Sequence, residues 1–347
     1  MREPARLHSP TMQTGDTPYT RLTPANAAAS PLHRRPSVLA LAGAVAISCG
    51  LLGSVAVRRS APGGELDLRS GRQRLRFVNG CQKDDIWLAG TAVAVPLFTP
   101  DVKLGAGEEY AFTVPDAGLA STRFWPKWGC NEAGQMCAIG QSGGPGEACA
   151  PEGCAPPVDS KFEATFGCKL EPSRCARNPS APDQPIGAVD WWDVSQVDGW
   201  TLPYKVEVSG DCPQSPSVID CSTLALSQCP DKEDLGPAHG EQDLQLHALH
   251  NKTQVVGCYS PCGKLSFGQW GQGYGHAPQS EEARDFCCPT PPVQPEACSS
   301  GPVARALYTE AVHRLCPSVY AFAYDDGVGL AQCPAGVEYK VTFYCPR

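Results

Sequence analysis

The stretch Cys316–Pro346, CPSVYAFAYDDGVGLAQCPAGVEYKVTFYCP, combines three cysteines, two adjacent aspartates and a strand-like ending. Its segment Tyr339–Tyr344 is rich in β-branched and aromatic residues, which favour β-strands. Similar short runs with turn-forming residues close by lie upstream, at Arg74–Val78, Ile86–Val95, Glu109–Val114 and Tyr204–Val208. Together with 35 glycines and 34 prolines in 347 residues, this pattern predicts a mainly β fold, a sandwich or barrel of antiparallel strands.

Helical signals are fewer. Ser300–Pro302 can begin a helix whose apolar residues recur on one face over Val303–Leu315, before Cys316 ends it. A shorter helix is predicted over Ser222–Gln228. Residues 231–315 as a whole are predicted to form a disulfide-rich subdomain of loops and helices.

The cysteines indicate where the chain folds. Eighteen of the 19 lie downstream of the apolar stretch Ser37–Val57, and Cys49 lies within it. An even set of this kind is typical of disulfides formed outside the cytosol. Zinc binding is the weaker interpretation, because no CxxC pairs with a second CxxC and the seven histidines do not interleave with the cysteines.

The N-terminal part predicts a membrane or secretory signal. The 21 residues of Ser37–Val57 contain no charge and, as a helix, would span roughly 30 Å, one bilayer core. We expect a signal anchor with a cytosolic N-terminus, and a signal peptide cleaved after Ser54–Ala56 is the alternative. Residues 1–36 are predicted to be disordered and 58–73 to be a linker. The domain at 74–347 is then extracytoplasmic, in a single-pass membrane protein or in a secreted one.

The charge of residues 58–347 excludes one class of partner. Residues 1–57 hold five arginines against two acidic residues, a balance of +3, so the remainder carries −8 − 3 = −11. A body this acidic repels phosphate backbones and anionic lipid surfaces. We therefore expect no nucleic-acid partner.

Several blocks resemble one family. Asp190–Pro203, DWWDVSQVDGWTLP, resembles the segment of thaumatin-like proteins usually written DFYDVSLVDGYNLP, and Cys316–Pro346 resembles that family's C-terminal block. Arg123–Trp125 followed by Gly-Cys, and Phe77–Cys81 followed by Ile-Trp, are similar to two further family motifs. The resemblance covers residues 74–347, includes the pathogenesis-related group 5 and osmotin-like members, and implies the thaumatin-like antiparallel β-sandwich.

The resemblance also implies disulfide pairs. By position these are Cys81–Cys345, Cys130–Cys137, Cys212–Cys333, Cys221–Cys316, Cys229–Cys258, Cys262–Cys287 and Cys288–Cys298. One family cysteine is replaced by Ser142, and three extra cysteines appear downstream. The pairs Cys149–Cys154 and Cys168–Cys175 would close two local loops; Cys149–Cys168 with Cys154–Cys175 is the alternative.

The family typically has an acidic cleft made by one Arg, one Glu and three Asp. The matching residues are Arg123, Glu163, Asp193, Asp198 and Asp325. Glycoside hydrolysis needs a proton donor and a second carboxylate. We expect Glu163 to be the donor and Asp193 or Asp198 the second carboxylate, with Arg123 keeping one partner ionised. The structural alternative is that both aspartates belong to turns and that Arg123 makes an ordinary ion pair.

Two further features bear on this cleft. Aromatic faces for sugar stacking could come from Trp191, Trp192, Trp200 and Tyr324. The segment Gly167–Val189 is an insertion relative to the family. It either walls the cleft and changes substrate choice, or displaces Glu163.

Other candidates are weaker. His247 and His250, with His239 nearby, could bind metal, but a solvated polar helix explains them better, so no metal or cofactor is expected. Asn251 begins an Asn-Lys-Thr glycosylation acceptor that is meaningful if a eukaryote makes the protein.

Three functions follow from these residues. The first is a monomeric, extracytoplasmic protein that binds β-1,3-glucan-type polysaccharide through the acidic cleft, in defence or at the cell wall. The second is a weak endo-β-1,3-glucanase that uses the same cleft. The third is a membrane-tethered protein-binding or inhibitor module.

Overall fold

The computed structural model describes residues 70–92, 102–141, 154–155, 158–179, 181–239, 245–268 and 272–346. The chain divides into two units, Met1–Glu65 and Leu66–Arg347, and every described residue belongs to the second. The predicted disordered segment and the predicted anchor or signal peptide therefore lie outside the described residues, as does most of the linker. Among the helices within the described ranges, none is long and apolar enough to cross a membrane.

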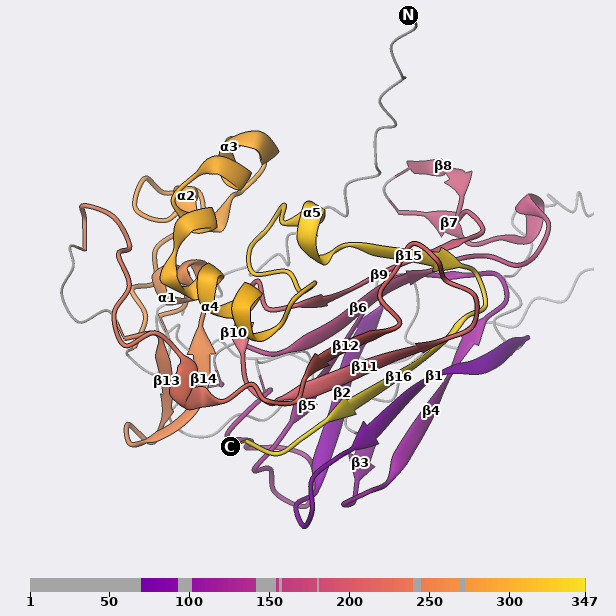
Figure 1. Ribbon diagram of the computed structural model, residues 1–347, viewed down its shortest axis with the longest axis horizontal. Helices are drawn as coiled ribbons and strands as arrows, with labels where there is room; N and C mark the ends of the chain where they lie inside the picture. Colours follow the sequence, from indigo (N-terminus) through magenta and orange to yellow (C-terminus); the bar gives the residue numbers. More distant parts are fainter. Residues whose placement is uncertain are drawn as a thin grey trace, which may run out of the picture. The chain divides into compact units, whose positions relative to one another are not determined.

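Two sheets form the main body of the domain (Figure 1). One has the strand order β12-β11-β16-β1-β4 and the other β15-β9-β6-β5-β2-β3. In chain order the strands are β1 (Gly71–Asn79), β2 (Ile86–Ala92), β3 (Val102–Leu104), β4 (Glu109–Pro115), β5 (Leu119–Lys127), β6 (Lys161–Phe166), β7 (Arg177–Asn178), β8 (Ala181–Pro185), β9 (Val189–Ser195), β10 (Gly199–Trp200), β11 (Tyr204–Ser209), β12 (Val218–Cys221), β13 (His247–His250), β14 (Gln254–Tyr259), β15 (Ala331–Pro334) and β16 (Glu338–Phe343). The predicted mainly β sandwich is confirmed.

The sandwich departs from purely antiparallel pairing at one place. Strands β1 and β16 run parallel, with Leu75 opposite Tyr339. These strands come from opposite ends of the domain, so no tight turn has to join them and a parallel pair is allowed.

Aromatic side chains from both sheets fill the core between them. Phe77 of β1 lies 4.8 Å from Phe124 of β5, measured between ring centroids, and Phe162 of β6 lies 6.0 Å from Trp192 of β9. All four rings are at most 2% exposed. Because side chains alternate along a strand, the neighbours of these residues point to the outer faces of the sandwich.

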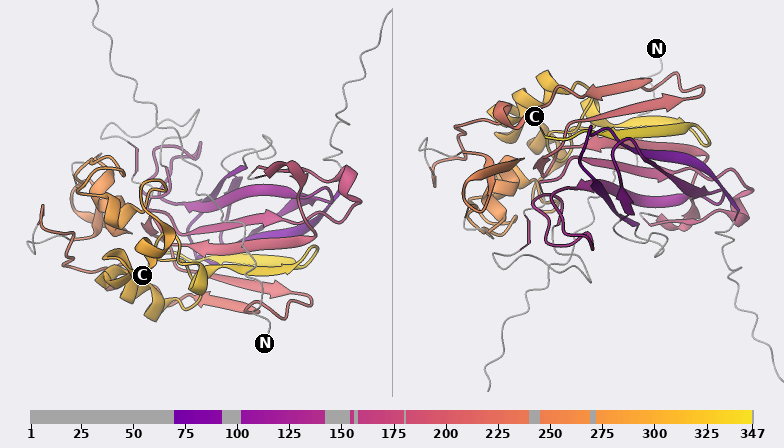
Figure 2. Two further views of the ribbon diagram at one scale, coloured as in Figure 1. Left: turned by 90° about the horizontal axis from the view of Figure 1, so that it is seen from above. Right: turned by 90° about the horizontal axis from the view of Figure 1, so that it is seen from below.

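The helices gather at one end of the sheets, where Figure 2 shows them beside the strands. They are α1 (Pro261–Ser266), α2 (Arg284–Cys287), α3 (Pro295–Ser300), α4 (Leu307–Leu315) and α5 (Asp326–Gly329). Within the predicted disulfide-rich subdomain the structure adds a hairpin, β13–β14, whose second strand pairs with β10.

Two helix predictions are wrong in detail. The segment Ser222–Gln228 forms only a 3₁₀ turn at Leu226–Gln228. The helix predicted from Ser300 is interrupted: a 3₁₀ turn at Val303–Arg305 precedes α4, and Ala306 between them is extended. The buried carboxylate of Glu233 accepts the N–H groups of Leu307 (3.1 Å) and Tyr308 (2.8 Å), which fixes where α4 begins.

The disulfides agree with the predicted pairs. All seven pairs implied by the family resemblance are formed. Cys168–Cys175 is formed as well, so the alternative that paired Cys154 with Cys175 is wrong. Cys154 is also disulfide-bonded, while its expected partner Cys149 lies outside the described residues. A domain with these bridges belongs to an oxidising, secretory or extracellular compartment.

Candidate functional site

Three charged side chains lie in one row across the six-stranded sheet. Arg123 on β5 is directly opposite Glu163 on β6, which is directly opposite Asp193 on β9. Directly opposed residues have Cβ atoms about 4.5–5.5 Å apart. Because Phe124 and Phe162 face the core, the row lies on the outer face of the sheet. We call Arg123, Glu163 and Asp193 the charged row.

The two carboxylates of the charged row have unlike surroundings. Arg123 Nε lies 2.6 Å from Glu163 Oε1, and the Glu163 side chain is 18% exposed. Asp193 is 5% exposed. Burial, and next the charge of Glu163, raise the pKa of Asp193 well above 3.8, and the opposing effect of Arg123 does not cancel them. Asp193 therefore keeps its proton to a higher pH than an ordinary aspartate.

Asp326 rather than Asp325 acts on this group. The charge of Asp326, at the start of α5, also raises the pKa of Asp193, and Asp326 Oδ1 accepts a hydrogen bond from the Tyr320 hydroxyl at 2.5 Å. Asp325 instead has a structural role. Its Oδ2 lies 2.7 Å from His313 Nε2 and accepts the N–H of Ala321 at 3.0 Å.

Asp198 is paired with a residue next to the charged row. It forms an ion pair with Lys161, which lies two residues before Glu163 on β6 and on the same face. Burial lowers the pKa of Lys161, but the charges of Asp198, Asp159 and Glu163 outweigh burial and raise it. Asp198 lies in the turn that Gly199 N–H closes onto Gln196 O at 3.2 Å. This turn requires Gly199, whose φ is 141° and whose added Cβ would lie 2.2 Å from a backbone oxygen.

The aromatic residues predicted to stack on a sugar differ in their burial. Trp192 and Trp200 are fully buried, so they cannot stack on a sugar. Trp191 is half-buried on β9, two residues before Asp193 and on the same face. Trp125, two residues after Arg123 on β5, is half-buried on that face as well. Tyr324 is half-buried but lies beside the structural Asp325.

Sequence reasoning missed Trp125, Lys161, Tyr320 and Asp326. Counting by twos from Arg123 and Glu163 would have found the first two, since side chains two apart share a face of a strand. Tyr320 joins the sheet by an isolated bridge to Ser195, and no sequence pattern predicts that contact.

The insertion Gly167–Val189 does not displace Glu163, which stays in register with both neighbouring strands. Its backbone bonds to the turn between β4 and β5, through Lys169 N–H to Asp116 O (2.9 Å) and Ala176 N–H to Ala117 O (2.8 Å). Gly167 follows Glu163 by four residues, about 13 Å along a strand. The insertion therefore lies at the end of the sheet.

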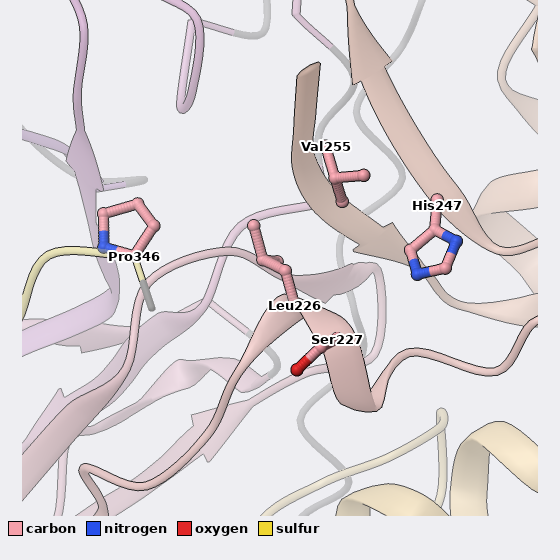
Figure 3. Close-up of a pocket in the computed structure, with 5 residues that line it drawn as sticks. All are labelled: Leu226, Ser227, His247, Val255 and Pro346. Carbon is pink, nitrogen blue, oxygen red and sulfur yellow. The ribbon is translucent and has the colours of Figure 1, made fainter. Parts of the chain in front are cut away.

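Two hollows lie away from the charged row. One, of about 300 Å³, is lined by Leu226, Ser227, His247, Val255 and Pro346 (Figure 3). The other, of about 550 Å³, borders α4 at Leu307 and Arg314. Neither has a lining residue from the six-stranded sheet. We place the candidate site at the charged row because it combines an ion pair with a carboxyl group of raised pKa, which the described residues lining the two hollows do not.

The predicted polar helix around His247 and His250 is wrong, since both lie on strand β13. His247 Nδ1 is 3.8 Å from a carboxylate oxygen of the exposed Asp231. Across the described ranges, no three His, Cys, Asp or Glu side chains come together as metal ligands.

The fold and site define a disulfide-rich β-sandwich protein with a charged outer face. The model of the thaumatin family matches residues 79–346, so the chain belongs to the thaumatin family. It is 30% identical to a glucan endo-1,3-beta-glucosidase of Prunus avium, over 56% of this chain and 68% of that protein. It is 26% identical to thaumatin-like protein 1 of Arabidopsis thaliana, over 72% and 76%.

Among solved structures, the thaumatin-like xylanase inhibitor is similar at 19% identity. That match covers 39% of this chain and 76% of the inhibitor, with a TM-score of 0.26.

Proposed function

We propose that the outer face of the six-stranded sheet binds a β-1,3-glucan-type polysaccharide outside the cytoplasm. The observation that supports this most is the position of two tryptophans on either side of the charged row. Trp125 and Trp191 lie two residues from the row in opposite directions, so they are about 13 Å apart along the strands. Half-buried aromatic faces beside carboxylates suit a ligand with apolar ring faces and many hydroxyls.

The glycan class rests on a relative. The Prunus avium protein is named a glucan endo-1,3-beta-glucosidase, and its similarity to this chain supports β-1,3-glucan as the first ligand to test. A role in defence or at the cell wall goes with this ligand.

A weak endo-β-1,3-glucanase activity is the second candidate, because the two adjacent carboxyl groups differ. In this proposal Asp193, which keeps its proton, donates it to the leaving oxygen, and Glu163, beside the Arg123 guanidinium, is the second carboxylate. These roles are the reverse of those expected from sequence. Directly opposed residues have Cβ atoms about 5 Å apart, and side chains that start this close can reach the carboxyl separation of about 5 Å that is typical of retaining glycosidases.

A carbohydrate acceptor is proposed at the tip of the β13–β14 hairpin. Asn251 and Lys252 have φ of 50° and 62°, as in a tight hairpin turn, and Asn251 and Thr253 are exposed. In a eukaryotic host, treatment with an N-glycosidase would lower the apparent mass of the wild type but not of Asn251→Gln.

Retention on insoluble β-1,3-glucan tests the proposed function. We expect the wild type to be retained, and Asp193→Asn and Glu163→Gln to be retained less. The matched control is Glu207→Gln. Glu207 lies on the five-stranded sheet, where its carboxylate is paired with two lysines of the same sheet. A wild type that is not retained overturns glucan binding and leaves the protein-binding or inhibitor module as the function to pursue. Retention without release of reducing sugar overturns the hydrolase.

A further inference from the structure

Two histidines from distant segments meet in the disulfide-rich subdomain. Nε2 of His239 lies 3.2 Å from Nε2 of His276. The ring of Tyr274 packs against both: its centroid is 4.0 Å from that of His239 and 5.9 Å from that of His276, nearly parallel to the latter. Both imidazoles are half-buried.

The backbone holds these rings in place. The N–H groups of Tyr274 and His276 donate to the carbonyls of Lys264 (3.0 Å) and Leu265 (2.9 Å) in α1. Helix α1 is joined to α2 by the Cys262–Cys287 disulfide. His239 closes its own turn through its N–H to Gly236 O at 3.1 Å. Backbone hydrogen bonds and a nearby disulfide therefore hold the segments that carry the two ring nitrogens.

The spacing of the nitrogens fits a metal ion. Two imidazole nitrogens bound to one tetrahedral Zn²⁺ at 2.0–2.1 Å are about 3.3–3.4 Å apart, and a square-planar ion brings them to about 2.9 Å. The observed 3.2 Å lies between these values. We propose that His239 and His276 form a two-histidine site for a borderline divalent transition-metal ion, with water in the remaining coordination positions.

The surroundings favour a cation. The carboxylate of Glu282 is within electrostatic reach of both imidazoles. Two nitrogen ligands and water suit Cu²⁺, Ni²⁺ and Zn²⁺. Of these three ions, Cu²⁺ is expected to bind most tightly. A direct N–H···N hydrogen bond between the rings gives a similar nitrogen spacing and is the competing interpretation.

Titration of the intact, oxidised chain with Cu²⁺, Ni²⁺ and Zn²⁺ tests the site. We expect the wild type to bind one ion at this site, most tightly when the ion is Cu²⁺. His239→Gln and His276→Gln should each bind it at least tenfold more weakly. The matched control is His250→Gln, a half-buried histidine of the same subdomain, which should bind as the wild type does. In the paramagnetic resonance spectrum of bound Cu²⁺, nitrogen coupling should fall from two imidazoles to one in either variant.

Unchanged affinity in both variants, or an equal loss in the control, would overturn the metal site and leave only the hydrogen bond. Absence of binding by the wild type would do the same. If one variant does not fold, the other variant and the imidazole count in the wild type still decide. Since glucan retention needs none of these residues, failure here is distinct from failure of the proposed function.

Discussion

The two outer faces of the sandwich use the same side-chain types and reach opposite results. On the five-stranded sheet, the Glu207 carboxylate accepts from Lys205 (3.2 Å) and Lys340 (3.1 Å), and all three side chains are 28–49% exposed. On the six-stranded sheet, the single guanidinium of Arg123 faces two carboxylates, Glu163 and the buried Asp193.

The difference lies in the ratio of charges and in burial. Where cations outnumber carboxylates in water, each carboxylate is ionised and paired, which is a stable and chemically ordinary state. Where carboxylates outnumber cations in a poorly solvated row, one of them keeps its proton. A protonated acid beside an ionised carboxylate is chemically useful, and for this reason we assign function to the six-stranded sheet.

The largest effect should come from breaking the buried ion pair that joins the two sheets of the sandwich. Arg74 of the five-stranded sheet donates to Asp190 of the other, with Nη1–Oδ2 at 2.5 Å and Nη2–Oδ1 at 3.1 Å, and both are at most 4% exposed. Replacing one partner leaves a buried unpaired charge, so Asp190→Asn should cost about 3–5 kcal/mol of unfolding free energy. Urea unfolding with intact disulfides measures this cost.

The matched control for that pair is Arg76→Gln, since Arg76 lies two residues along β1 and makes an exposed ion pair with Glu109 at 2.8 Å. It should cost at most about 1 kcal/mol. Equal losses in the two variants would mean that burial does not separate the pairs.

Asp193→Asn should remove a pH effect on stability whose sign is opposite to that of an ordinary ion-paired aspartate. The folded-state pKa of Asp193 is raised above its ordinary 3.8 by burial and then by Glu163. Between these two pKa values the folded state holds a proton that the unfolded state has released, so wild-type stability falls as pH rises through this window. The asparagine variant should escape the fall and be more stable than the wild type at neutral pH.

Melting temperatures of both proteins from pH 3 to 8 check this sign. A wild type that gains stability relative to the variant as pH rises would show that Asp193 is an ordinary ionised aspartate and would remove the proton donor.

Trp191→Ala should lower retention on β-1,3-glucan about tenfold, the change expected for the loss of one contributing aromatic contact of about 1.4 kcal/mol. Trp125→Ala should act similarly. Tyr344→Ala is the control, because Tyr344 is a half-buried aromatic residue directly after β16 of the five-stranded sheet. Retention equal to the wild type in both test variants would move the ligand away from the charged row.

The sequence allowed the fold to be predicted further than the site. The alternation of apolar residues fixes which face of a strand is buried, and it would also have separated Trp191 from Trp192, which point to opposite faces. The disulfides followed from the family, except that Cys168–Cys175 needed the structure to exclude its alternative.

The choice between Asp325 and Asp326 could not be read from the sequence. It depends on the tight turn after Tyr324, whose φ is 68°, and this turn directs one carboxylate to His313 and the other to Tyr320. The pairing of His239 with His276 likewise depends on how distant loops fold, and residue types alone do not encode it.

Glu207→Gln should have the smallest effect and the pH dependence opposite to that of Asp193. Hydrogen bonds from Lys340 and then Lys205 lower the pKa of Glu207 from 4.5, so the wild-type contribution is complete above 4.5 and is lost as pH falls through the lower folded-state value. At neutral pH the substitution should cost less than about 1 kcal/mol, and less still in high salt. Melting curves at pH 3 and 7 measure it beside Asp193→Asn. If both variants lost stability relative to the wild type as pH rose, the two faces would be electrostatically alike, and burial of Asp193 would no longer distinguish a site from a solvated surface.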